Sequence, residues 1–109
     1  MQRTIKAFKI PCNGQLPELV EIPDELEVYQ EFVGGDIEIV RIPPDAIMVV
    51  NDPGPIDGLP INLIASAFYP APTPICGNAW IVGDHHDEYF HDVPQRFIDT
   101  FGKLDKIIL

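Results

Sequence analysis

A pair of glycines, Gly34 and Gly35, separates a helical pattern from two apolar strand patterns, and this junction limits the fold more than any other feature. Before it, apolar residues recur at intervals of three and four positions, which places them on one face of a helix. These residues are Leu26, Tyr29, Phe32 and Val33. Pro23 suits the first position of a helix, and glycine suits the left-handed position that ends one. The sequence therefore predicts a helix over residues 23–33 that packs one face on a sheet.

Two strands and a tight turn follow the double glycine. Residues 37–42 and 46–50 are rich in Ile and Val, and the turn residues Pro43, Pro44 and Asp45 lie between them. Residues 46–50 are apolar on both faces, which is typical of a strand inside a sheet. The two strands are therefore expected to form an antiparallel hairpin.

Further elements are predicted on either side of this hairpin. Strands are expected over residues 3–10, 19–22 and 79–83, with an edge strand over residues 106–109. A short helix capped by Asn62 is expected to run to Tyr69, and a last helix to begin at Asp92 and Pro94 and stop at Gly102.

Together these elements predict a single α+β domain over residues 1–109. We expect a mainly antiparallel sheet of four to six strands, with one principal helix packed on a face. Two shorter helices should lie at the sheet's edge or on the same side. Ile5 and Ala7 point to one face of the first strand, whereas Phe8 and Ile10 point to the other. Both faces of the sheet are therefore expected to be partly covered.

The charge and hydropathy of the chain disfavour binding to nucleic acid and insertion into a membrane. The chain has 17 acidic and 7 basic residues, a formal net charge of −10, and such a surface opposes binding to a nucleic-acid backbone. No run approaches the roughly 18 apolar residues of a membrane span, and Lys6 and Lys9 interrupt the start of the chain where a signal peptide would be apolar. A cytoplasmic protein without a membrane partner is expected.

Cys12 and Cys76 are expected to be reduced thiols, with a disulfide as the alternative.

A proline- and glycine-rich loop over residues 51–62 is the candidate for contact with a ligand. Prolines restrict the free chain, glycines allow a ligand to approach the backbone, and Asn62 opens a helix whose free N–H groups suit an anion. The candidate ligand-binding residues are Asn51, Asp52, Gly54, Gly58, Asn62, Ser66 and Arg41. The alternative is an ordinary connection in which Asn51 and Asn62 bind backbone groups. Anion binding also needs bases, which Arg3, Lys6, Lys9 or Arg41 could supply, including across a homodimer interface.

The acidic segment DHHDEYFHD carries the other candidate chemistry. Imidazole and carboxylate groups suit zinc or nickel, so His85, His86 and His91 are candidate metal ligands. However, adjacent histidines in an extended segment point to opposite sides, and the spacing is no known zinc motif. A solvated acidic loop explains the composition equally well. Trp80 and Tyr29 are expected in the core, and no nucleophile has a base at a recognisable spacing, so neither catalytic residues nor cofactors are predicted.

The order of several motifs resembles a known family. The runs EIPDELEVYQEFVGGDIEIVRIP, VVND, GLPIN and GNAWIVG follow one another between residues 18 and 83. In this order they resemble a family of small domains of unknown function found mostly in phage, prophage and plasmid genomes. The DPGPID and DHHDEYFHD segments depart from the family pattern. The resemblance implies a mobile-element setting, in which small proteins often act on host defence, and it transfers no catalytic residue.

Three functional hypotheses follow. The first is a non-enzymatic phage or mobile-element protein that sequesters a small nucleotide-type immune signal in a pocket of the 51–62 loop. The second is an acidic inhibitor that binds a host defence protein by imitating nucleic acid. It requires an exposed stripe of seven carboxylates, Glu18, Glu21, Glu25, Glu27, Glu31, Asp36 and Glu38. The third is a metal-assisted enzyme that uses the histidine segment.

Overall fold

The expected α+β fold is confirmed. The computed structural model describes residues 3–52 and 58–108, with side chains described up to residue 102. Six antiparallel strands form one sheet in the order β2-β1-β5-β4-β3, with β6 paired to β5. The elements are β1 (Thr4–Ile10), β2 (Glu18–Pro23), α1 (Leu26–Val33), β3 (Ile37–Ile42), β4 (Ala46–Asn51), α2 (Leu63–Phe68), β5 (Ala79–Asp84), β6 (Phe90–His91) and α3 (Gln95–Ile108).

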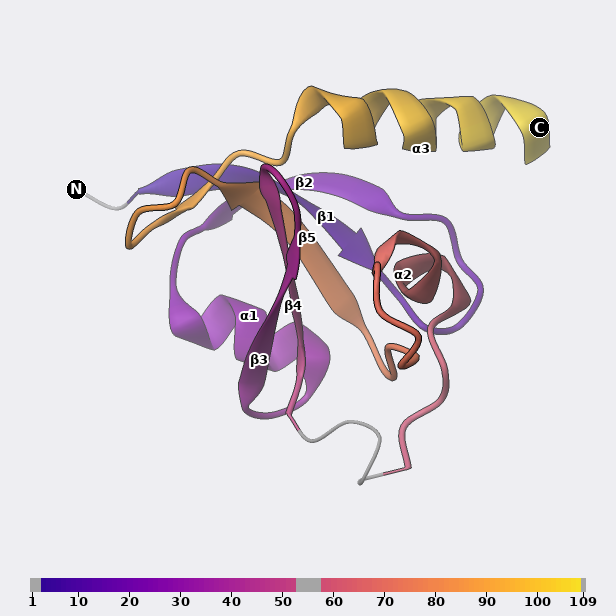
Figure 1. Cartoon of the computed structure of the whole chain (residues 1–109), viewed down its shortest axis with the longest axis horizontal. Coiled ribbons are helices and arrows are strands. Elements are labelled where there is room, and N and C mark those ends of the chain that lie inside the picture. Colours follow the sequence, from indigo (N-terminus) through magenta and orange to yellow (C-terminus); the bar gives the residue numbers. More distant parts are fainter. Residues whose placement is uncertain (1–2, 53–57, 109) are drawn as a thin grey trace.

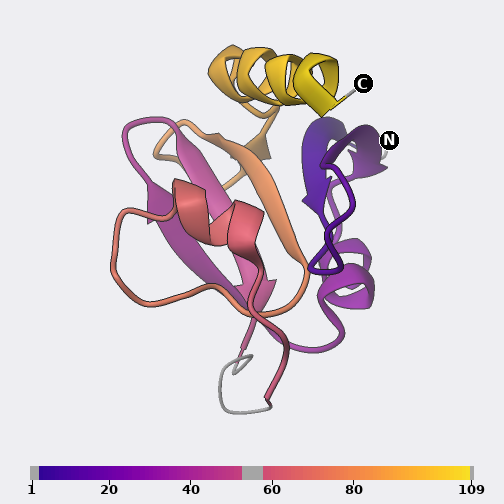
Figure 2. The same ribbon diagram turned by 90° about the vertical axis from the view of Figure 1, so that its right-hand side faces the viewer.

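The sheet is covered on both faces. Figures 1 and 2 show α1 and α2 on opposite sides of it, and α3 shares a hydrophobic core with α2. The placement of the later helices at the edge or on the side of α1 was therefore wrong. The alternation of β1 explains the difference, because its apolar residues point to both faces and each face must be shielded from water.

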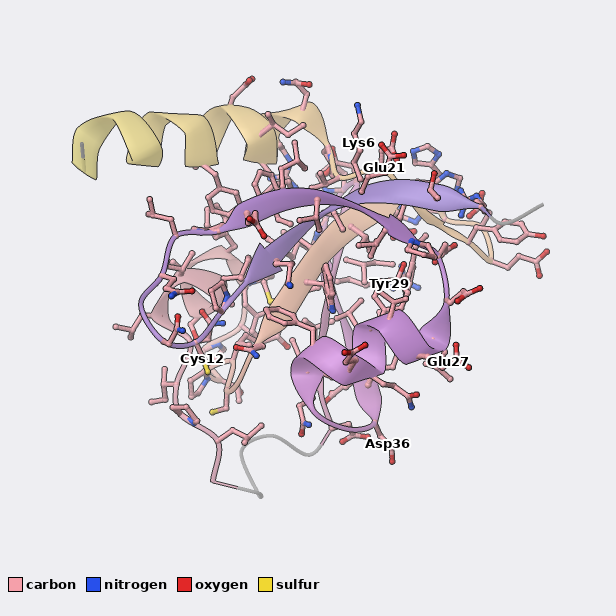
Figure 3. All side chains as sticks on the ribbon, turned by 180° about the vertical axis from the view of Figure 1, so that it is seen from behind. Lys6, Cys12, Glu21, Glu27, Tyr29 and Asp36 are labelled. Atoms are coloured by element: carbon pink, nitrogen blue, oxygen red, sulfur yellow. The ribbon has the colours of Figure 1, made fainter. Side chains whose placement is uncertain are left out.

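The core on the α1 face is built around two aromatic residues. Tyr29 and Trp80 are each 2% exposed, and their rings meet edge to face with centroids 5.9 Å apart. Ile5 and Ala7 of β1 belong to this core, as the alternation of β1 predicts. Figure 3 views the molecule from this side, with β1 and β2 above α1.

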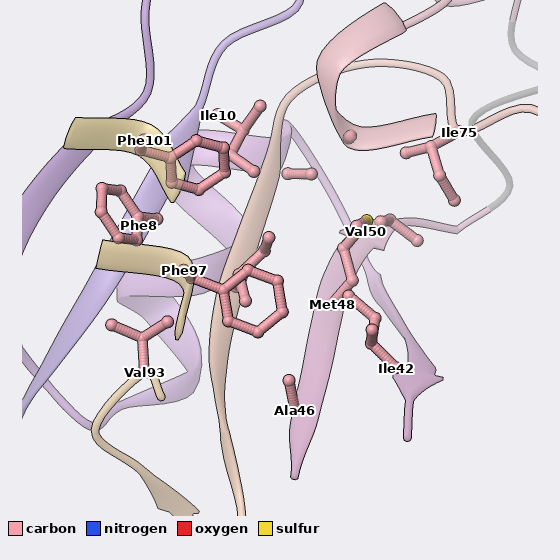
Figure 4. Close-up of a cluster of buried hydrophobic side chains, with 13 residues drawn as sticks. Phe8, Ile10, Ile42, Ala46, Met48, Val50, Ile75, Val93, Phe97 and Phe101 are labelled. Atoms are coloured by element: carbon pink, nitrogen blue, oxygen red, sulfur yellow. The ribbon is translucent and has the colours of Figure 1, made fainter. Parts of the chain in front are cut away.

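The core on the other face joins α2 and α3 to the sheet. Phe8 of β1 packs edge to face against Phe101 of α3, with ring centroids 4.6 Å apart. Figure 4 shows Phe97 and Phe101 of α3 over side chains of the sheet, which include Ile10 and Met48. The predicted contribution of Phe8 and Ile10 to a second covered face is confirmed.

The predicted end of α1 is confirmed, whereas its predicted start is wrong. Gly34 has φ 85°, in the left-handed region, and its N–H donates to Gln30 O at 2.8 Å, as expected of a helix stop. At the other end, α1 begins at Leu26 rather than at Pro23. Pro23 instead completes β2, where it pairs with Thr4.

The last helix departs most from expectation. It continues through Gly102 to Ile108, so neither the predicted stop nor a strand over residues 106–108 is present, and Leu109 lies outside the described residues. At 14 residues α3 is longer than α1, which has 8. Gly102 lacks a left-handed φ. A glycine inside a helix costs only about 1 kcal/mol relative to alanine, and the lysine, leucine and isoleucine residues beyond it continue the helix.

Two further properties concern the described residues. Cys12 and Cys76 are free thiols. Within residues 3–52 and 58–108, no helix combines the length and the apolar character that crossing a membrane requires.

Candidate functional site

A groove lies between α1 and β2, on the face of the sheet that α1 covers. α1 packs against β3, β4 and β5. Ile5 of β1 and Ile22 of β2 are buried in the core with Tyr29 of α1, whereas Val20 of β2 is only half-buried at the side of the helix. The resulting groove has a volume of about 460 Å³, and its lining residues are Lys9, Val20, Ile22, Val28, Glu31, Phe32, Asn78 and Trp80.

The walls of the groove are mainly apolar. Val20 comes from β2, Val28 and Phe32 come from α1, and all three are half-buried. The rings of Phe32 and Trp80 meet edge to face at 5.0 Å. The volume falls within the roughly 300–1,000 Å³ of typical small-molecule sites, which are likewise lined mostly by apolar side chains.

Asn78 holds the end of the groove in place. Its Nδ2 donates to Phe32 O at 2.9 Å, and its Oδ1 accepts from Cys12 N at 2.9 Å. One side chain thus joins the last turn of α1 to the chain just after β1. Nε1 of Trp80 adds a 3.4 Å hydrogen bond to Tyr29 O. These bonds fix the position of the Phe32 wall before any ligand arrives.

Lys9 supplies a positive charge at the groove. Its side chain is half-buried, with Nζ 4.8 Å from the ring centroid of Phe32 and 5.9 Å from that of Trp80. The ammonium is thus held by the aromatic rings. Among the residues that the structure describes, Lys9 has no carboxylate partner. The three described arginines do, in the pairs Arg3–Asp24, Arg41–Asp84 and Arg96–Asp45.

Sequence reasoning did not select this groove. Lys9 was predicted as one of four bases that could supply charge to a pocket in the 51–62 loop, and no role was predicted for Asn78. The local signal for Asn78 is its place between Gly77, which has φ 83°, and the buried strand β5. That signal indicates a polar side chain at a strand start, but it does not reveal that the partners are Phe32 and Cys12.

Two of the predicted ligand-binding residues, Asn62 at the end of the loop and Ser66 in α2, bind backbone groups. Asn62 is 1% exposed, and its Nδ2 donates to Ile10 O and Gly77 O at 2.9 Å each. Its Oδ1 caps α2 by accepting from Ala65 N at 3.0 Å. Ser66 Oγ accepts from the backbone N of Ile75 at 2.9 Å. These contacts correspond to the alternative interpretation, in which the loop side chains satisfy the backbone.

The structure does not bring the remaining loop candidates together. Arg41 binds Asp84 at 2.6 Å and pairs with Ile47 on β4, four residues from Asn51, or roughly 13 Å along a strand. Asn51 Nδ2 donates to Val33 O at 3.0 Å, and its buried Oδ1 has no partner among the described residues.

Three candidates of this loop remain. Asp52 is exposed and donates its N–H to Asp36 O at 2.9 Å. Gly58 is exposed with φ 73°, and Gly54 lies outside the described residues.

His91 lies between a base and an acid. Its Nε2 is 2.9 and 3.0 Å from the two carboxylate oxygens of Asp87, and its Nδ1 is 3.3 Å from Arg3 Nη2. The imidazole thus lies within hydrogen-bond distance of the Asp87 carboxylate on one side and of the Arg3 guanidinium on the other. The N–H of Tyr89 foremost, and then His91, lower the pKa of Asp87.

His85 and His86 contact different parts of the molecule. His85 stacks on His91, with ring centroids 3.7 Å apart, whereas His86 turns to Pro44, with Nε2 2.9 Å from its carbonyl oxygen. Asp92 accepts from Lys6 N at 2.9 Å. Within residues 3–52 and 58–102, no three His, Cys, Asp or Glu side chains converge as a metal site.

The seven carboxylates of the acidic stripe are all exposed. They are Glu18, Glu21, Glu25, Glu27, Glu31, Asp36 and Glu38. Figure 3 labels Glu21 on β2, Glu27 on α1 and Asp36 after α1; Glu21 lines a hollow with Lys6, on the side of the sheet opposite the groove. Glu31 is the member of this set that lines the groove, whereas Glu38 lies on the opposite face of the sheet.

Comparison with known proteins identifies the family. The model of a family described as a domain of unknown function (DUF3846) matches residues 5–105. The chain therefore belongs to this family. No curated protein and no solved structure matches it.

Proposed function

We propose that this member of a family of unknown function is a non-catalytic binding protein that holds a small molecule in the groove beside α1. The single observation that carries the proposal is an apolar groove whose ammonium group, that of Lys9, has no carboxylate partner among the described residues. Asn78 holds the backbone of Phe32 in place, which restricts this wall before a ligand binds. Apolar contact with Val20 and Val28 supplies affinity, and the Lys9 charge supplies orientation.

The biological role that we propose is sequestration. In the mobile-element setting implied by the family resemblance, the protein would remove a small host signal by binding it. A nucleotide-type immune signal has the required parts, since its base is planar and its phosphate is anionic. The groove beside α1 replaces the 51–62 loop as the proposed location, because the side chains of Asn62 and Ser66 already bind backbone groups.

The test begins with the protein purified from cells in which it acts. Native mass spectrometry should show a small molecule bound to the folded chain. A panel of aromatic carboxylates and of cyclic and linear nucleotides should then include a compound that stabilises the protein, by about 2.7 kcal/mol at a hundred times Kd.

A groove-filling variant locates the binding. Val28→Trp places a large side chain in the groove and should abolish binding. Ile39→Trp is the matched control, because Ile39 is 46% exposed on β3 and does not line the groove. Binding that survives Val28→Trp, or a protein that is empty from cells and unaffected by the whole panel, would refute the proposal.

The acidic surface supports a second candidate function, the inhibition of a nucleic-acid-binding protein. The specific observation is that all seven predicted carboxylates are exposed, with Glu21 and Glu38 on the face of the sheet opposite Glu31. Binding to such a target should weaken steeply with salt, because exposed charges are screened. Glu27→Gln combined with Glu31→Gln should weaken binding further. Affinity that does not change between 50 and 300 mM salt would contradict this role.

A further inference from the structure

The lining of the groove contains two charges of opposite sign. Lys9 projects from β1 and Glu31 from α1, and the other lining residues are apolar apart from Asn78. Asn78 uses its amide on Phe32 and Cys12. Lys9 and Glu31 are therefore the side chains that set the charge of an acceptable ligand.

Lys9 favours an anionic group. Its ammonium lies beside the Phe32 ring and has no carboxylate partner among the described residues, in a chain whose acids outnumber its bases by 17 to 7. A carboxylate or phosphate oxygen placed at Nζ would form a charge-assisted hydrogen bond. Because Lys9 is half-buried, water screens this bond less than it screens a bond at the open surface.

Glu31 opposes a second negative charge. Its carboxylate is exposed at the same groove, and the chain carries a formal net charge of −10. A ligand with two or more negative charges would meet one favourable partner and one unfavourable partner in the groove, and the field of the whole protein would add to the repulsion.

We propose that the ligand of the groove is an amphipathic molecule with a single negative charge, and that Lys9 and Glu31 select that charge. This inference rests on the proposed function of the groove. The apolar body of the ligand packs between Val20, Val28 and Phe32. Its one carboxylate or phosphodiester binds Lys9 Nζ.

The test uses probes that share one body and differ in charge. They are naphthalene-2-carboxylate, naphthalene-2,6-dicarboxylate and naphthalene-2-carboxamide, with bis(4-nitrophenyl) phosphate to distinguish a phosphodiester from a carboxylate. Binding to the full chain is followed by NMR shifts, including the indole signal of Trp80, and by calorimetry. The monocarboxylate should bind at least tenfold more tightly than the amide or the dicarboxylate.

The variants assign the preference to the two residues. Lys9→Gln should remove the advantage of the monocarboxylate over the amide, and Glu31→Gln should improve dicarboxylate binding severalfold. Lys6→Gln is the matched control, because Lys6 has the same charge on the same strand but lies on the opposite face and outside the groove. Its binding profile should equal that of the parent protein.

The outcomes separate the two proposals. If the probes bind in the groove, as shown by loss of binding in Val28→Trp, but without a charge preference, the inference is overturned and the groove function stands. The same holds if Lys9→Gln keeps the preference. If none of the four probes shifts the NMR signals of the groove residues, the inference of a singly charged ligand is refuted. If no compound of the panel of aromatic carboxylates and nucleotides binds either, the proposed binding function of the groove is also refuted.

Discussion

The hydroxyl of Tyr29 donates a 2.7 Å hydrogen bond to Oδ1 of Asp24, which in turn binds the guanidinium of Arg3 at 2.7 Å. These contacts connect a buried residue of α1 to the segment before it and to the start of the chain. Burial of Tyr29 is the main cause that raises its pKa above the ordinary value of 10.0, and the hydrogen bond to Asp24 raises it further. The folded protein thus favours the neutral phenol.

The Tyr29 contact predicts a loss of stability at alkaline pH. Because the pKa is higher in the folded state, its stabilising effect is complete below pH 10 and decreases as pH rises above that value. Tyr29→Phe should cost about 1–2 kcal/mol at pH 7, since it removes a hydrogen bond to a carboxylate. The difference between parent and variant should shrink above pH 10, as measured by urea unfolding at pH 7, 9, 10 and 11.

Tyr89→Phe provides the control, because Tyr89 is 53% exposed and its ring lies beside Arg3. This variant should remain close to the parent at every pH. A constant difference between parent and Tyr29→Phe up to pH 11 would show that the phenol is not protected by folding.

The left-handed turn at Gly34 predicts a conformational cost for any larger residue. An added Cβ there would meet no atom within 4 Å, so steric contact with neighbours contributes nothing. Gly34→Val should therefore lose about 1–2 kcal/mol from the left-handed conformation alone. Gly34→Asn should lose less, because asparagine adopts this region more readily. Urea unfolding measures both, and equal stability of Gly34→Val and the parent would contradict the assignment.

Asn62 is predicted to act through stability rather than through ligand contact. Asn62→Ala leaves the carbonyls of Ile10 and Gly77 without this donor and removes the cap on Ala65, which should cost about 3–5 kcal/mol. Asn13→Ala should cost below about 1 kcal/mol, because Asn13 bonds Gln15 N in an exposed turn. A stable Asn62→Ala protein that has lost ligand binding would instead return Asn62 to the binding residues.

Local patterns predicted the elements well because the deciding interactions are local. The helix stop depends on the backbone of Gly34, and the two-sided burial of β1 follows from the alternation of Ile5, Ala7, Phe8 and Ile10. The end of α3 was harder, because one glycine can stop a helix or sit inside it at a small cost.

The groove could not be predicted in the same way because it depends on strand order. It exists because the edge strand β2 lies next to β1 and beside α1, and no local pattern specifies which strands become neighbours. Asn62 shows the same limit. A helix-capping asparagine is compatible with a ligand site and with a structural role, and only the distant partner Ile10 distinguishes the two.

The contact between His91 and Asp87 predicts a carboxyl group that stays ionised in acid. The N–H of Tyr89 and the His91 side chain hold the pKa of Asp87 below its ordinary value of 3.8. Its stabilising effect should thus be complete above that value and decrease as pH falls through the lower pKa of the folded state. The largest cause is the backbone bond from Tyr89, so His91→Ala should raise the pKa only part of the way. Carboxyl carbon NMR between pH 2 and 6 measures both proteins. A pKa at or above 3.8 in the parent would show that this loop does not hold Asp87 as described.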